Sequence, residues 1–243
     1  MSGDATAILG HLDSVAAIRV QVASEPLLAE RFEGVKSFQH ARFAGTYRDL
    51  LADPAYTGAA RFFLEELYGP HDFTARDAQF ARIVPALVRL FPGEVVVTVR
   101  ELSELHALAE RLDLEMAHAL VAETGLDGRR YRAAWRQVGQ ASQRARQISL
   151  MLDIGGALSR FTRNRWLRHS LRMMRGPASA AGLGALQQFL EAGFDTFAGL
   201  ASPDLFLKMI AERERKIADV LFDPEETLRL PAEFDTLDFV FDV

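Results

Sequence analysis

Residues 94–123, EVVVTVRELSELHALAERLDLEMAHALVAE, are predicted to form one long helix that ends before Gly125. Val95–Val97 has the composition of a strand, but one isolated β-branched run does not predict a sheet. Apolar residues recur along the stretch at steps of three and four, as on one face of a helix. This face consists of Leu102, Leu105, Ala109, Leu112, Met116 and Leu120.

Helix signals continue in both directions from this stretch. Pro26 lies at a position where a first-turn proline is tolerated and opens one helix. Ser202 is the predicted N-cap of a later helix, with Pro203 at its first position. Asp127 is placed to cap a second long helix that follows Gly125. We therefore predict an all-α protein, with a single-domain multi-helix bundle of about eight or nine helices over residues 1–222. An irregular acidic tail, residues 223–243, is expected to pack on the bundle.

The composition removes several classes of chemistry. The 243 residues include no cysteine, which excludes disulfides, thiolate metal sites and cysteine nucleophiles. The first residues lack the basic and apolar segments of a signal peptide, and no run of about 18 apolar residues predicts a transmembrane helix. We expect a cytoplasmic protein without a cofactor, which needs no metal or disulfide to fold.

The net charge of −5 is unevenly distributed. Residues 129–175 hold twelve arginines and one acid, whereas residues 223–243 hold seven acids and one arginine. Such asymmetry indicates either an anionic partner or mutual neutralisation of the two segments.

Within the basic segment, four arginines recur at steps of three and four and define an arginine stripe. This stripe could meet an acidic protein surface, an anionic membrane or nucleic acid. Because the whole protein is acidic, nucleic acid is disfavoured, and a solvated face or a docking site for the acidic tail is the simpler interpretation. The stripe consists of Arg165, Arg168, Arg172 and Arg175.

Residues 62–92, FFLEELYGPHDFTARDAQFARIVPALVRLFP, begin with the heptapeptide FFLEELY. The segment resembles the uncharacterised bacterial family known by that motif, and seven identical residues in a matching setting are specific. The resemblance implies a helical bacterial protein and carries no chemistry with it.

Glu66 lies within the apolar arc of the FFLEELY helix when its residues are placed on a helical wheel. A carboxylate there needs a partner or a proton, because an unpaired buried charge is costly. Arg42, Arg76 and Arg82 are possible partners. We favour a Glu–Arg tie that fixes how the helix docks. The alternative is a carboxylate that faces a ligand pocket, with Tyr68 and His71 beside it.

Histidines offer little support for a metal site. Glu115 and His118 form the Glu-x-x-His unit of di-iron bundles, but no second unit occurs and both point away from the apolar face. His106 lies at the edge of that face and most simply belongs to the core edge. No metal ligand set, phosphate loop or nucleophile elbow is found. We therefore favour a non-enzymatic interaction or scaffold protein. The alternative is a ligand- or cofactor-binding helical protein, possibly an enzyme, with a pocket near Glu66 and His106.

Overall fold

The computed structural model describes residues 3–67, 73–122 and 125–223, and its described part is helical throughout. The first half contains α1 (Gly3–Ser24), α2 (Pro26–Thr46), α3 (Arg48–Ala52), α4 (Thr57–Phe62), the π-helical turn η1 (Phe63–Leu67) and α5 (Thr74–Leu90). The second half contains α6 (Gly93–Ala119), α7 (Gly128–Val138), α8 (Ala141–Thr162), α9 (Arg165–Met173), α10 (Arg175–Ala180), α11 (Gly184–Gly199) and α12 (Pro203–Phe222).

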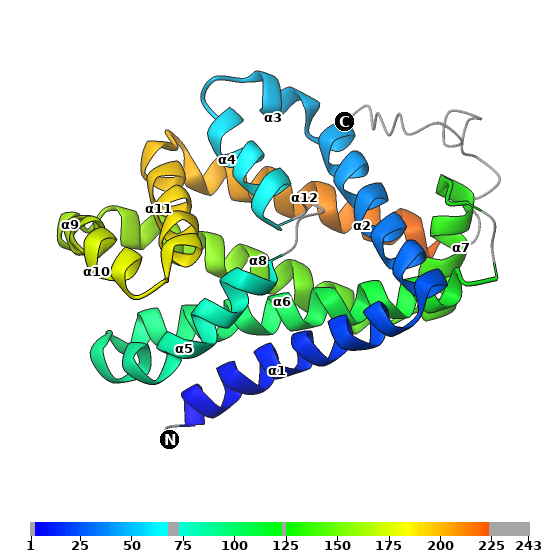
Figure 1. Cartoon of the computed structure of the whole chain (residues 1–243). Coiled ribbons are helices and arrows are strands. Elements are labelled where there is room, and N and C mark those ends of the chain that lie inside the picture. Colours follow the sequence, from blue (N-terminus) through cyan, green and yellow to red (C-terminus); the bar gives the residue numbers. More distant parts are fainter. Residues whose placement is uncertain (1–2, 68–72, 123–124, 224–243) are drawn as a thin grey trace.

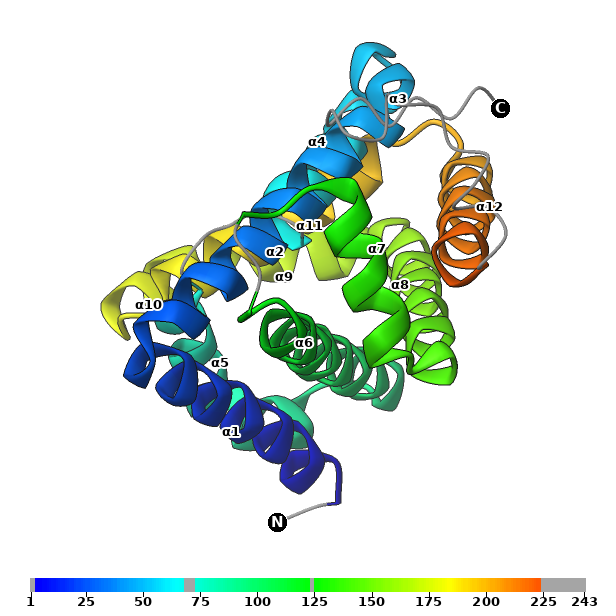
Figure 2. The ribbon, with the colours of Figure 1, turned by 90° about the vertical axis from the view of Figure 1, so that its right-hand side faces the viewer.

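Helix α6 is the axis of the molecule. It packs against α1, α2, α7 and α8, and Figure 2, which views α6 nearly end-on, shows these helices around it. Helix α8 continues the core by packing against α11 and α12 (Figure 1). The apolar face predicted for residues 94–123 explains this position, since Leu112, Met116 and Leu120 are fully buried.

The expected all-α class is confirmed, but the count of eight or nine helices is wrong, because the described residues form twelve α-helices. The largest difference is a break in the helix expected after Asp127. Gly139 and Gln140 both have positive φ, at 68° and 61°, which ends α7 and starts α8 in a new direction. Asp127 does cap α7, where its Oδ1 accepts the N–H of Arg130 at 2.8 Å.

Aromatic side chains bind the outer helices to this core. Phe43 of α2, Tyr47 directly after that helix, Phe63 of η1 and Phe206 of α12 meet in one buried cluster. A second cluster stacks Phe38 on Tyr131, with ring centroids 4.3 Å apart. The two clusters place α2 and α12 over α7 and α8, and a cavity lies between them and α6.

Candidate ligand cavity

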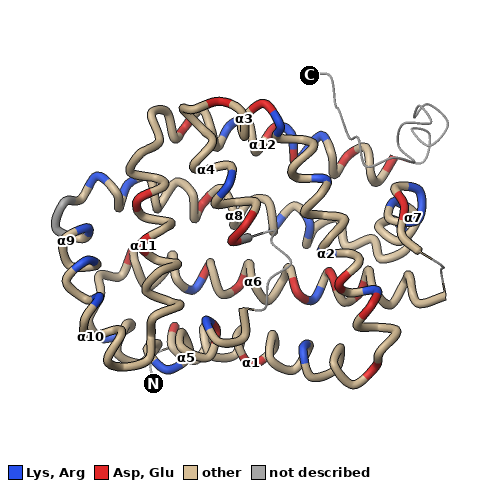
Figure 3. Tube along the Cα trace, turned by 45° about the horizontal axis from the view of Figure 1, so that its top comes forward, with Lys and Arg blue, Asp and Glu red and all other residues tan. Residues whose placement is uncertain are grey.

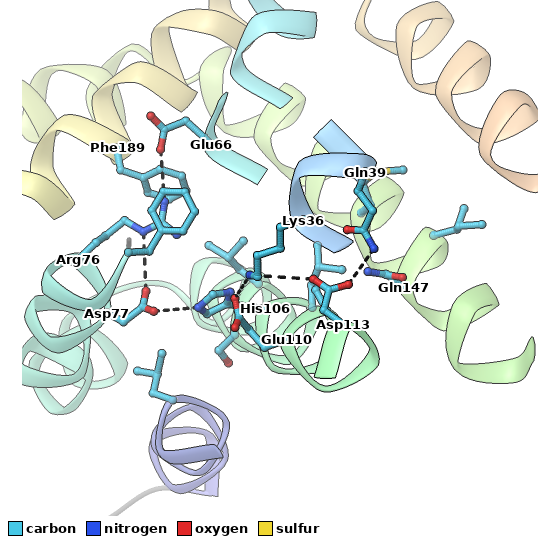
Figure 4. A pocket seen from close by; sticks show the side chains of 18 of the residues that line it. Lys36, Gln39, Glu66, Arg76, Asp77, His106, Glu110, Asp113, Gln147 and Phe189 are labelled. Carbon is cyan, nitrogen blue, oxygen red and sulfur yellow. Dashed lines mark hydrogen bonds and ion pairs between the residues drawn. The ribbon is translucent and has the colours of Figure 1, made fainter. Parts of the chain in front are cut away.

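A cavity of about 190 Å³ lies at the centre of the bundle. Its lining comes from α1, α2, η1, α5, α6, α7, α8, α11 and α12, so residues far apart in sequence meet there. Part of the wall is apolar, as at Leu105 and Met151. Another part consists of charged side chains, several of which are labelled in Figure 4. Mixed linings of this kind hold the body of a small molecule and orient it through a few polar groups.

One face of α6 supplies several of the polar side chains of the wall. Ser103, His106, Glu110 and Asp113 are separated by three, four and three residues, so they follow one line along the helix. All four line the cavity. They adjoin the apolar face of α6, and packing against α2 and α8 therefore buries Glu110 and Asp113 to 3% and 6% exposure.

The first polar group of the cavity, the Asp77 cluster, joins α1, η1, α5 and α6. Asp77 Oδ2 lies 2.8 Å from His106 Nε2 and 2.9 Å from a guanidinium nitrogen of Arg19. Arg76 donates to Glu66 at 3.3 Å and has Nε 3.8 Å from Asp77. Burial tends to raise the pKa of Asp77, but the hydrogen bond from His106 and the neighbouring positive charges outweigh it and hold that pKa below its ordinary value.

Arg76 is held between two aromatic rings. Its guanidinium carbon lies 3.9 Å from the Phe73 ring centroid. The ring centroid of Phe189 lies 4.5 Å from the same carbon (Figure 4). Burial lowers the pKa of Arg76, and the carboxylates of Asp77 and Glu66 partly oppose that shift. The rings and carboxylates thus fix a cation at the α5 end of the cavity.

The second polar group, the Lys36 cluster, joins α2 and α6. Lys36 Nζ donates to Glu110 Oε1 at 2.5 Å and lies 4.0 Å from Asp113 Oδ2. Gln39 donates to Asp113 Oδ1 at 2.8 Å (Figure 4). Burial raises the pKa of Asp113, although Lys36, Gln39 and Arg144 oppose the shift.

Two buried polar atoms of the cavity wall have no hydrogen-bond partner among the described residues. They are Glu110 Oε2 and Trp135 Nε1. An unsatisfied acceptor or donor in a protein interior is rare and calls for an explanation such as water or a ligand. Both atoms belong to residues that line the same cavity.

The residues predicted to partner Glu66 or to line a pocket near the FFLEELY helix lie in different places in the structure. Glu66 meets Arg76, one of its three candidate partners, and remains about one-third exposed. Arg42 instead pairs with Glu214 at 2.7 Å, and Arg82 donates to the carbonyl of Ala181. His106 lines the same cavity as Glu66, whereas Tyr68 and His71 lie outside the described residues.

Sequence reasoning missed Lys36, Asp77, Glu110 and Asp113. A signal was present for Asp113, because a wheel of roughly 100° per residue places it about 20° from Leu102, at the border of the apolar face of α6. No such signal identified Lys36 or Asp77, whose partners are 74 and 29 residues distant.

The arginine stripe lies on α9 and α10, beside the acidic residues of α11 (Figure 3). Arg168 and Arg172 both face Asp195, at 2.8 and 3.5 Å, and Arg175 lies 2.6 Å from Glu191. The side chain of Arg165 and residues 224–243 of the acidic tail lie outside the described part of the chain.

Other candidate groups take surface roles. Glu115 lies 3.7 Å from Arg111, and His118 contacts Gln21. Over the described residues, no group of three or more histidine, aspartate or glutamate side chains is arranged to hold a metal ion. No helix in that part of the chain is long and apolar enough to cross a membrane.

A family model described as "Domain of unknown function (DUF8198)" matches residues 19–228. The match spans most of the chain and includes every helix of the cavity wall except part of α1. No curated protein and no solved structure matches the chain. The resemblance at residues 62–68 predicts an uncharacterised family, and the matched family is of that kind, although the match does not test the motif itself.

Proposed function

The chain belongs to the DUF8198 family, and from its central cavity we propose that it binds a small, largely apolar molecule. The observation that carries this proposal is the cavity of about 190 Å³ with two unsatisfied polar atoms in its wall. A dry cavity of ~150 Å³ in another protein holds benzene, so the space suits a ligand of similar or slightly larger size.

The wall supports binding rather than simple packing. A core without function would gain stability from apolar filling, because replacing buried ion pairs with hydrophobic residues is often neutral or stabilising. Here the Asp77 and Lys36 clusters both line a hollow space. Preformed polar groups in an apolar cavity orient a ligand and select for it.

The experiment compares the native mass of the purified protein with its denatured mass. We expect an excess native mass that is lost on denaturation. Ala109→Phe should remove this excess, because Ala109 lines the cavity on α6 and a ring would fill the space. Ala16→Phe, at an exposed position of α1, is the matched control and should retain the excess.

A natural ligand could be lost during purification. We therefore also measure the binding of propylbenzene to the purified protein by calorimetry. We expect propylbenzene to bind the wild type and Ala16→Phe, but not Ala109→Phe. Equal native and denatured masses, together with no propylbenzene binding to the wild type, would overturn the proposal.

The interaction function predicted from the arginine stripe remains a separate prediction. Its support is weaker, because three of the four arginines already face carboxylates of α11. Arg165→Glu combined with Arg172→Glu would abolish capture of an acidic partner while leaving propylbenzene binding intact. Unchanged partner capture by this variant would exclude the stripe as the binding surface.

A further inference from the structure

We infer that the ligand of this cavity carries an ammonium group and that Glu110 binds it. The inference rests on the proposed ligand-binding function and adds the chemical class of the ligand. Three observations carry it: one buried oxygen of Glu110 has no hydrogen-bond partner among the described residues, the charges beside Glu110 favour a cation, and the Lys36 ammonium already binds between Glu110 and Asp113.

Glu110 has one oxygen engaged and one open. Oε1 accepts from Lys36 Nζ, while Oε2 is buried and has no hydrogen-bond partner among the described residues. The side chain is only 4% exposed, so bulk water does not solvate it freely. Because a carboxylate only accepts hydrogen bonds, the missing partner must be a donor.

The charges of the wall favour a cationic donor. Five carboxylates line the cavity: Glu66, Asp77, Glu110, Asp113 and Glu214. The basic side chains that line it are four: Lys36, Arg42, Arg76 and Arg144. Among the described residues, Arg19 pairs with Asp77 from α1 and brings the basic side chains of the two clusters and the wall to five, so the excess of negative charge is local: Glu110 and Asp113 share the one ammonium of Lys36. A ligand ammonium would balance that excess, whereas a ligand carboxylate would meet Glu110 and Asp113 and be repelled.

Lys36 demonstrates that an ammonium fits between these carboxylates. Its Nζ lies 2.5 Å from Glu110 and 4.0 Å from Asp113, so one cation is shared by two acids spaced three residues apart on α6. A second ammonium can use the open Oε2 of Glu110. The apolar body of the ligand would then lie along Leu102 and Leu105, which face the cavity on the same helix.

The test uses three probes that share a phenyl ring and a chain of similar length: 2-phenylethylamine, propylbenzene and 3-phenylpropanoate. Their affinities for the wild type are measured by calorimetry at pH 7. We expect the amine to bind at least tenfold more tightly than propylbenzene, and the carboxylate to bind most weakly. This comparison needs no variant, so it stands even if a substitution impairs folding.

Two variants locate the effect. Glu110→Gln keeps the size of the side chain but removes its charge, and it should weaken amine binding at least tenfold with propylbenzene binding unchanged. Glu115→Gln, on the same helix but outside the cavity wall, is the control and should change neither. Lys36→Met removes the competing ammonium and should strengthen amine binding.

The outcomes distinguish the two proposals. If propylbenzene binds as tightly as the amine, or if Glu110→Gln retains the preference for the amine, the inference is overturned and the proposed function stands. If none of the three probes binds, the inference is overturned, and equal native and denatured masses would then overturn the proposed function as well. Tighter binding of the amine that depends on Glu110 supports both.

Discussion

Asp113 combines burial with incomplete compensation of its charge. Lys36 Nζ is 4.0 Å away and shared with Glu110, while Gln39 supplies a neutral hydrogen bond. Arg144 adds attraction, but burial dominates and the pKa of Asp113 is raised above its ordinary value of 3.8. The ionised form of Asp113 is therefore less favourable in the folded protein than in the unfolded chain.

The sign of the stability effect follows from proton binding. With a raised pKa, folded Asp113 holds its proton at pH values where the unfolded chain has lost it, so this group lowers the free energy of unfolding as pH rises from about 4 through the folded pKa. Asp113→Asn should remove that decline. Relative to the wild type, the variant should gain stability in urea unfolding as pH rises above about 4. Asp13→Asn, at an exposed position, is the control. A pH-independent difference for Asp113→Asn would contradict the argument.

At the same scale, the sequence predicted some members of the site and not others. Glu66 and His106 could be singled out because each is a polar residue within or beside an apolar arc. The wheel assumed regular α-helical geometry, however, and Phe63–Leu67 form a π-helical turn, which rotates Glu66 relative to that wheel. Lys36 could not be predicted, because its partners depend on how α2 crosses α6.

At the scale of the element, α8 approaches α12 closely at a glycine. A Cβ on Gly155 would lie 2.5 Å from a methyl carbon of Leu207, which is buried and has little room to rotate. Gly155→Ala should therefore lower the free energy of unfolding by about 1–3 kcal/mol through overpacking. A Cβ on the adjacent Gly156 would meet only the end of Arg160, at 3.7 Å.

Gly156→Ala is thus the matched control for this prediction, since both glycines are internal to the same helix. It should raise the free energy of unfolding by about 0.5–1 kcal/mol, because alanine loses less backbone entropy than glycine in a helix. Urea unfolding of both variants measures the two effects. Changes of the same sign would show that Leu207 does not restrict the approach of α8.

Helix signals and helix breaks were not equally readable from sequence. Capping by Asp127 and the start of α12 at Pro203 follow from local chemistry, so they could be predicted. The break at Gly139–Gln140 could not, because a single glycine between good helix formers is compatible with a continuous helix. The turn is favoured by tertiary packing, because α7 packs on α6 and α12 while α8 packs on α6.

At the scale of the whole molecule, the cavity connects the two halves of the chain. Its wall includes residues from Leu12 to Leu221, so a bound ligand would contact elements formed from nearly the entire described sequence. Ligand binding should therefore stabilise the fold as a unit. A ligand present at 100 times its Kd adds about 2.7 kcal/mol to the free energy of unfolding.

One buried link between the two halves is formed by Glu214 of α12. Its Oε1 accepts from Arg42 at 2.7 Å and from the Tyr47 hydroxyl at 2.8 Å, both on the α2 side and more than 160 residues away in sequence. Because each member is about one-tenth exposed or less, removal of one partner leaves a buried charge uncompensated. Arg42→Met and Glu214→Leu should each lower the free energy of unfolding by about 3–5 kcal/mol.

The double variant tests whether the loss of stability comes from the Arg42–Glu214 ion pair or from the other contacts of each residue. Two buried residues in contact are energetically coupled, so Arg42→Met with Glu214→Leu should cost less than the sum of the single changes. Apolar replacement of both partners is often close to neutral, which sets the expected direction. A double-mutant cycle from urea unfolding measures the coupling. If the two losses simply add, Arg42 and Glu214 stabilise the protein through their separate neighbours, and the ion pair does not hold α2 to α12.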